Sequence, residues 1–329
     1  MQTSLEPPSS AKRWAIIGAA GAVGRATGAE LERRGISFRV LGRRREALET
    51  AFGSMSLAEI VPADVSDGAA LSDALRGADT AVYAVGLPYT NFAQHPALMA
   101  KALEACVESG VRRLVVVSNV YVYGVPNTTP LDETHPLEPC SIKGKMRLEQ
   151  EEIAFAAHRA GRIQTLVVRP ADFYGPGAEL SYAHTIFESA LAGKPATLLS
   201  PADTPHQFTF IPDLAPSLVS LALLDSAYGE AYNIGGPRAT VRTFAREVYT
   251  QVGAPFKTRE YGKTMLRLAG IFDPLMREMV EMHYLQTKPV IASDAKLRAI
   301  LGDAPETPLK NGIAATLAYL RDRVSREIY

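Results

Sequence analysis

The stretch Ile16-Ile-Gly-Ala-Ala-Gly-Ala-Val-Gly-Arg25 contains three glycines spaced as G-x-x-G-x-x-G. These glycines are Gly18, Gly21 and Gly24. The stretch lies between an apolar run at residues 14–17 and a helical pattern at residues 22–34. Glycines at a strand-to-helix turn let the backbone approach a pyrophosphate, and the first amides of the helix can bind its oxygens. The stretch therefore predicts a dinucleotide-binding turn, and the alternative is a tight turn that binds nothing.

Short apolar runs and longer helical patterns alternate on either side of this turn. Strands are expected at residues 14–17, 37–41, 58–61, 80–85, 113–118 and 164–168, and helices at about residues 22–34, 91–109 and 141–160. Strands that alternate with helices of this length indicate βαβ units, which form a parallel sheet with helices on both faces. The fold class is therefore α/β, with a Rossmann-type doubly wound parallel sheet in residues 13–170.

After Pro170 the segments become shorter and richer in proline and glycine. Isolated strands are expected at residues 208–211 and 231–234, and separate helices at residues 241–252 and 273–284. Residues 171–329 are therefore expected to form a smaller, mostly helical substrate lobe that is interleaved with the last elements of the sheet. Residues 1–12 lack an apolar segment and are expected to be a disordered tail without a signal sequence.

The composition excludes several classes of protein. With 35 basic and 35 acidic residues, the net charge of zero gives no reason to expect nucleic acid or a membrane surface as the main partner. No apolar run approaches the roughly 18 residues of a membrane span. Two cysteines, Cys106 and Cys140, cannot form a disulfide framework and lack metal-ligand spacing, so a reducing, cytoplasmic setting is the default. The expected partner is a small-molecule substrate, with a homodimer left open.

The end of the second expected strand favours NADP(H) over NAD(H). NAD sites usually place an Asp or Glu there, which accepts a hydrogen bond from the ribose 2′-hydroxyl. This chain has Arg43, Arg44 and Arg45 instead. Guanidinium groups suit a 2′-phosphate, and no carboxylate is present to repel it. The alternative is a solvated, basic start of a helix.

Further motifs follow the glycine turn in a fixed order. They are Ala63-Asp64-Val65, Ser118-Asn-Val-Tyr-Val-Tyr-Gly124, Arg169-Pro-Ala-Asp-Phe-Tyr-Gly-Pro-Gly177, Phe208-Thr-Phe-Ile-Pro-Asp-Leu214 and Tyr232-Asn-Ile-Gly-Gly236. The ordered set resembles the short-chain dehydrogenase/reductase superfamily, in its extended, NAD-dependent epimerase/dehydratase-like branch. The resemblance covers about residues 13–240 and implies hydride transfer to or from a hydroxyl or carbonyl of a small molecule.

The resemblance also implies a set of cofactor contacts. Asp64 and Val65 would contact the adenine, with a turn or helix-cap role as the alternative for Asp64. Pro170 and Phe173 would border the nicotinamide. The full expected set is Gly18, Ala20, Gly21, Ala22, Val23, Gly24, Arg43, Arg44, Asp64, Val65, Ala84, Val85, Gly86, Ser118, Lys143, Arg147, Pro170 and Phe173. Most of these residues follow expected strand ends, where open α/β sheets bind ligands.

The chain departs from the family at its three catalytic positions, which are a Ser or Thr, a Tyr, and a Lys four residues after the Tyr. Asn119 stands at the Ser or Thr position. When the family pattern is aligned on Gly144, Lys143 takes the Tyr position and Arg147 the Lys position. Arg147 would keep its proton and could anchor a ribose hydroxyl or phosphate. Asn119 can donate an N–H to a carbonyl oxygen, and Lys143 can serve as a general acid.

Two other interpretations of this helix stay open. A second register places Ser141 at the Tyr position and Lys145 at the Lys position. Alternatively, the helix is a solvated face on which i,i+4 ion pairs contribute about a few tenths of a kcal/mol each. Those pairs would join Lys145 to Glu149 and Arg147 to Glu151.

A tyrosine on a loop could replace the missing proton donor. Tyr121, Tyr123 and Tyr174 all follow expected strand ends. Tyr123 has packing as its alternative role. The candidate catalytic set is therefore Asn119, Tyr121 and Lys143, and no metal site is expected.

Two functions follow from these observations. The first is an NAD(P)-dependent oxidoreductase or epimerase/dehydratase-like enzyme that uses a non-standard proton donor. The alternative is a non-catalytic, NADP(H)-binding protein that senses redox state or regulates a partner. The retained motifs in the expected substrate lobe favour the enzyme.

Overall fold

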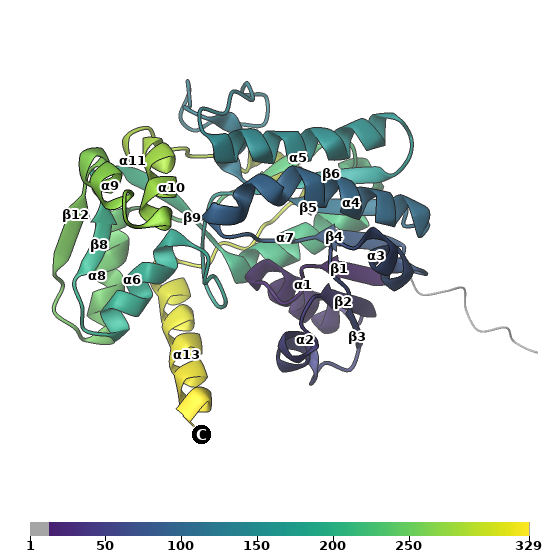
Figure 1. Cartoon of the computed structure of the whole chain (residues 1–329), viewed down its shortest axis with the longest axis horizontal. Helices are drawn as coiled ribbons and strands as arrows, with labels where there is room; N and C mark the ends of the chain where they lie inside the picture. Colours follow the sequence, from purple (N-terminus) through teal and green to yellow (C-terminus); the bar gives the residue numbers. More distant parts are fainter. Residues whose placement is uncertain (1–12, 329) are drawn as a thin grey trace, which may run out of the picture.

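The centre of the protein is a seven-stranded parallel sheet (Figure 1). The computed structural model describes residues 13–328, with side chains through residue 323, so the predicted tail at residues 1–12 lies outside the described residues. In spatial order the strands are β10 (Ala231–Ile234), β6 (Gln164–Pro170), β5 (Arg113–Val117), β4 (Thr80–Tyr83), β1 (Trp14–Ile17), β2 (Phe38–Gly42) and β3 (Ala58–Pro62). The order reverses beside β1, so the sheet is doubly wound, as the sequence predicts.

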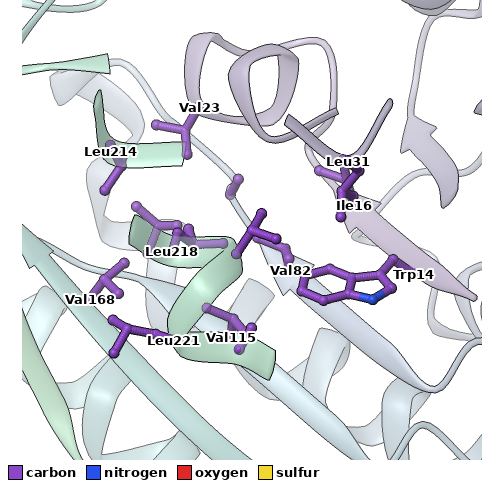
Figure 2. Packing of buried hydrophobic residues seen from close by; sticks show 14 of the residues in the cluster. Trp14, Ile16, Val23, Leu31, Val82, Val115, Val168, Leu214, Leu218 and Leu221 are labelled. Carbon is purple, nitrogen blue, oxygen red and sulfur yellow. The ribbon is translucent and has the colours of Figure 1, made fainter. Parts of the chain in front are cut away.

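Helices cover both faces of the sheet, because its strands are apolar on both sides. One face carries α1 (Ala22–Arg33), α2 (Arg45–Phe52), α7 (Ile211–Leu223) and α12 (Ala295–Leu301). The other carries α3 (Gly68–Leu75), α4 (His95–Glu108) and α5 (Ile142–Arg159). Figure 2 shows Leu214, Leu218 and Leu221 of α7 packed over Val115 and other strand residues. Burying such a side chain stabilises the fold by about 1.5–3 kcal/mol.

The remaining strands and helices form a second layer beyond the carboxyl ends of the large sheet. The strands are β7 (Asp172–Tyr174), β8 (Ala196–Leu199), β9 (Pro205–Phe210), β11 (Arg238–Thr240) and β12 (Thr258–Tyr261). The helices are α6 (Tyr182–Leu191), α8 (Val241–Val252), α9 (Lys263–Ala269), α10 (Pro274–Met282), α11 (Tyr284–Thr287) and α13 (Leu309–Ile328), with 3-10 turns η1 (Tyr89–Gln94) and η2 (Val120–Tyr123). Phe187, Phe208 and Phe244 pack in its core. A third 3-10 turn, η3 (Asp225–Ala227), instead follows α7 and lies at the amino end of β5, where Asp225 pairs with Arg113.

The α/β fold class and the six strands expected before residue 171 are confirmed. The chain after residue 170 serves both layers, because β10 pairs with β6 of the large sheet while β9 pairs with β7. Short helices such as α2, α3 and α12 have no long apolar period, and the sequence did not predict them. Among the described residues, no helix is both long and apolar enough to cross a membrane.

Candidate active site

The glycine turn brings two expected cofactor segments together. The amides of Gly18 and Ala19 both donate to Leu41 O at 3.0 Å, which fastens the turn to β2. Gly18 has a φ of +83°, and a Cβ there would lie 3.0 Å from the backbone of Ala84 and Val85. Gly24 is equally constrained, since a Cβ would lie 2.5 Å from Ala19 O. Only glycine fits at these two points, so the turn lies directly against the end of β4.

The turn also has the chemistry that an anion requires. Gly21 caps α1 without a side-chain hydrogen bond, and the first turn of α1 contains no acidic residue. The amides at this helix start are therefore free of a competing carboxylate and can bind phosphate oxygens. The residues present fit a dinucleotide.

Basic residues follow β2, where the sequence predicts the 2′-phosphate of a bound NADP(H). Arg43 and Arg44 follow β2 and are exposed. Asp64 accepts hydrogen bonds from the amide and hydroxyl of Ser66, both at 2.8 Å. Burial opposes ionisation of Asp64, but these hydrogen bonds and the nearby charge of Arg43 lower its pKa overall. Asp64 is thus a turn-capping carboxylate close to Arg43, and an adenine contact for it stays a prediction.

A pair of tyrosine hydroxyls lies beyond the end of β5. Tyr121 is held in η2, where the Oδ1 of Asn119 accepts a hydrogen bond from the Tyr121 amide at 3.1 Å. The hydroxyl of Tyr121 lies 2.9 Å from that of Tyr89 in η1. Because Oδ1 of Asn119 accepts this hydrogen bond, the group that Asn119 retains for other partners is its Nδ2 donor.

Both phenols strongly retain their protons. Burial raises the pKa of Tyr89 to about 12, and burial together with Tyr89 and Asp172 raises the pKa of Tyr121 well above its usual range. Both hydroxyls are consequently protonated at neutral pH, so neither is available there as a phenolate base.

Lys143 is buried at the first turn of α5, and its side chain is only 2% exposed. Its Nζ donates to Glu278 Oε2 at 2.5 Å and to Glu281 Oε1 at 2.6 Å, both on α10. It also lies 5.0 Å from the centre of the Tyr89 ring. This ammonium therefore joins α5 to α10 beside the tyrosine pair, and the interpretation of a solvated helix face is wrong for Lys143.

Arg147 lies one helical turn further along and is also buried, with 8% exposure. Its Nη1 donates to Gln150 Oε1 at 2.8 Å, and its guanidinium lies 5.0 Å from the Phe92 ring. Burial lowers the pKa of Arg147. The expected pair with Glu151 is not formed, because Glu151 binds Arg169 instead. The solvated-face interpretation is therefore wrong for Arg147 as well.

His95, at the start of α4, is fully buried beside Arg147. Neither ring nitrogen has a hydrogen-bond partner among the described residues. Burial, with the charge of Arg147, lowers the pKa of His95 to about 2. The unfolded chain would bind a proton at this residue below pH 6.5, whereas the folded protein would not.

This difference predicts a specific acid sensitivity. The contribution of neutral His95 to the free energy of unfolding is fully present above pH 6.5. It is lost as the pH falls toward the pKa of His95 in the folded protein. Between pH 7.5 and 5.5 the wild type should lose about 1 kcal/mol more unfolding free energy than His95→Gln. Urea unfolding at both pH values tests this, and equal losses in the two proteins would contradict it.

A buried ion pair joins β6 to α5, the helix that carries Lys143 and Arg147. The Arg169 Nη2 of β6 lies 2.6 Å from Glu151 Oε2 of α5, and Nη1 donates to the Tyr123 hydroxyl at 2.9 Å. That hydroxyl donates to Asn233 Oδ1 at 2.7 Å. Tyr123 therefore packs and supports the loop, as its alternative role predicted. Tyr174 is buried in the aromatic core of the lobe and is not beside the Tyr89–Tyr121 pair.

The other expected residues lie near the turn or at strand ends. Ala20, Val23, Ala84 and Phe173 pack in or against one core cluster, Val65 and Val85 pack against the cluster on the opposite face, and Pro170 ends β6 beside Ile234. Ser118 is buried, and its hydroxyl has no partner among the described residues. Sequence reasoning missed Tyr89, Glu278 and Glu281. Only Tyr89 had a local signal, since it closely follows Ala84–Gly86, which is expected to contact the cofactor.

Comparison with known proteins identifies the family of the chain. The model of the NAD dependent epimerase/dehydratase family matches residues 14–235. The chain belongs to this family. It is accordingly an enzyme of the epimerase, dehydratase and dehydrogenase class, and the non-catalytic alternative is not supported.

Individual members of the family are distant relatives. The uncharacterized UDP-glucose epimerase YtcB of Bacillus subtilis is 24% identical over 227 residues, which cover 67% of this chain and 64% of that protein. The dTDP-6-deoxy-L-talose 4-dehydrogenase (NAD(P)(+)) of Kitasatospora kifunensis is 28% identical, with 77% and 83% covered. The crystal structure of UDP-glucuronic acid 4-epimerase from Bacillus cereus in complex with NAD has a TM-score of 0.78 at 19% identity, with 94% and 99% covered.

Proposed function

We propose that this protein is an NADP(H)-dependent reductase that acts on a carbonyl group of a small, sugar-like molecule. The observation that carries the proposal is the pair of hydroxyls of Tyr89 and Tyr121, 2.9 Å apart beside Asn119 beyond the end of β5. Their raised pKa values keep both hydroxyls protonated at neutral pH, and carbonyl reduction requires a group that carries a proton to give. Relatives whose names specify a 4-dehydrogenase or 4-epimerase of nucleotide sugars support this chemistry.

In this proposal each residue has a distinct task. Asn119 donates an Nδ2 hydrogen to the substrate oxygen, and Tyr121 gives that oxygen its proton as negative charge develops. Tyr89 then passes its own proton to Tyr121 and takes up a proton from solvent, which restores the pair. The nicotinamide supplies the hydride when bound. The turn from Gly18 to Gly24, with Ala20, Ala22 and Val23, would hold the pyrophosphate, and Ser118 offers a free hydroxyl near the end of β5.

Lys143 and Arg147 take the positions of the missing Tyr and Lys in our alignment. With two carboxylates around it, Lys143 is assigned the task of positioning Tyr89 and joining α10 to the site. Arg147 is assigned a cofactor contact on the ribose side, as the sequence predicts. Lys143→Met would test the first assignment, since it should alter turnover less than loss of the Tyr121 hydroxyl does.

The proposed activity has a direct test. Purified protein is mixed with NADPH and a panel of ketones that includes keto-sugars, and absorbance at the reduced nicotinamide band is followed. Consumption of NADPH with at least one ketone is expected. Tight NADPH binding without turnover of any ketone or hydroxyl compound would instead support the non-catalytic function.

Arg43→Asp should reverse the cofactor preference. The change removes a charge-assisted hydrogen bond to the 2′-phosphate and adds repulsion, so NADPH binding should weaken by about 10-fold or more while NADH binding changes little. Titration calorimetry measures both. Arg76→Asp, an equal charge change at an exposed site after α3, is the matched control. An unchanged ratio of the two dissociation constants in Arg43→Asp would remove Arg43 from the site.

A further inference from the structure

Arg25, the first residue after the glycine pattern, turns its side chain back onto the turn. Its Nε donates to Ala20 O at 2.7 Å, and its Nη1 donates to the Tyr319 hydroxyl of α13 at 3.1 Å. Arg25 is half-buried, and both of these partners are neutral. The guanidinium charge is therefore not compensated by any carboxylate among the described residues, although the group lies at the edge of an anion-binding turn.

The other arginines of α1 differ in this respect. Arg33 and Arg34, at the far end of the helix, both bind Glu30, at 2.7 and 2.5 Å. Arg25 is held in one orientation by neutral groups, which fix its geometry without neutralising it. A preoriented and uncompensated guanidinium beside free helix amides is well suited to bind a phosphate oxygen.

The C-terminal helix α13, yellow in Figure 1, also fastens the loop that follows β7. Arg323 of α13 forms an ion pair with Glu179 in that loop. A Cβ on Gly177 of the loop would lie 3.5 Å from Ala22, and the Leu180 side chain would lie 3.6 Å from a Cβ on Gly86. The loop therefore reaches from the glycine turn to the end of β4, and α13 holds both the loop and Arg25.

We propose that Arg25 is a phosphate-binding residue of the cofactor site and that Tyr319 of α13 is the residue that positions it. The inference rests on the proposed function, because it places a dinucleotide at the glycine turn. It adds a cation for the pyrophosphate that is distinct from Arg43 and Arg44, which lie at the 2′-phosphate end. It also gives α13 a part in cofactor affinity.

Two fragments of the cofactor separate the two phosphate positions. ADP contains the pyrophosphate but no 2′-phosphate, and adenosine 2′-monophosphate contains the 2′-phosphate but no pyrophosphate. Binding of NADPH, ADP and adenosine 2′-monophosphate is measured by calorimetry at two salt concentrations. The proteins are the wild type, Arg25→Gln, Tyr319→Phe and the control Arg33→Gln.

In Arg25→Gln, NADPH and ADP should bind about 10- to 100-fold more weakly, as expected for loss of a hydrogen bond to a charged group. Adenosine 2′-monophosphate should bind as in the wild type, and the salt dependence of ADP binding should decrease. Tyr319→Phe should weaken ADP binding by a smaller factor in the same direction. Arg33→Gln should bind all three ligands normally.

Different results would overturn the inference. If Arg25→Gln bound ADP and adenosine 2′-monophosphate more weakly by the same factor, the variant would disturb the fold of the turn rather than one contact. Unchanged ADP binding would remove Arg25 from the site. If either result were found and the wild-type protein still bound NADPH, the proposed function would remain intact. Failure of the wild type to bind any of the three ligands would instead refute the proposed function.

Discussion

Tyr121→Phe should lower kcat for ketone reduction by about 10²- to 10⁴-fold, the usual contribution of a positioned proton donor. The variant loses one oxygen and keeps the ring, so η2 should retain its packing. Binding of NADPH should stay near the wild-type value, because the phenol is not part of the glycine turn. Single-turnover kinetics with a ketone found in the panel, together with NADPH titration, would measure both quantities.

A matched control separates chemistry from packing. Tyr228→Phe removes a buried hydroxyl that donates to Ala222 O at 2.8 Å. The Tyr228 ring contacts Arg113 at the start of β5, at the opposite end of the strand from Tyr121. Tyr228→Phe should keep the wild-type kcat. If Tyr121→Phe also kept it while Lys143→Met abolished turnover, the ammonium would be the proton donor and the assignment of Tyr121 would be wrong.

The pH dependence of the reaction provides a second check on the same residue. Burial raises the pKa of Tyr89 to about 12, and the pKa of Tyr121 is raised as well. Both hydroxyls thus remain protonated from pH 7 to pH 9. The rate of reduction should show no decrease in this range from ionisation of a phenol, provided that NADPH and the substrate are saturating.

The parts of the fold that depend on local sequence were predictable. Gly18 and Gly24 mark the turn because a Cβ at either position would meet backbone atoms of the turn itself or of the adjoining strand. The strands before residue 171 are short apolar runs bounded by helices, so their parallel arrangement followed from length and order alone. The arginines that follow β2 and the lysines at the start of α5 could also be recognised from the sequence alone.

The surroundings of Lys143 were not predictable, because they come from the other end of the chain. Glu278 and Glu281 are 135 and 138 residues away from Lys143 in the sequence, and no local pattern links them. A lysine in a basic cluster at the start of a helix resembles part of a solvated face until its burial is known. Tyr319, which holds Arg25 from 294 residues away, is a further example. The sequence thus identifies candidate residues, and long-range ion pairs and hydrogen bonds determine their roles.

The ion pair between Arg169 and Glu151 connects the strand and the helix on which the site depends. The two side chains are 4% and 1% exposed, and three hydrogen bonds of 2.6 to 3.1 Å join them. Glu151 lies one turn after Arg147 on α5, and Arg169 directly precedes Pro170. Removing one partner would leave the other charge buried and unpaired, which is far costlier than losing the attraction itself.

Arg169→Met should therefore lower the unfolding free energy by about 3–5 kcal/mol, measured by urea unfolding at pH 7.5. The double variant Arg169→Met/Glu151→Leu replaces both charges by apolar groups and should recover much of that loss. Arg162→Met, which breaks the exposed pair with Glu104, should stay near the wild type. Should the double variant prove no more stable than Arg169→Met, an unpaired carboxylate would not be the cause, and the support of α5 by β6 would have to come from packing around Arg169 instead.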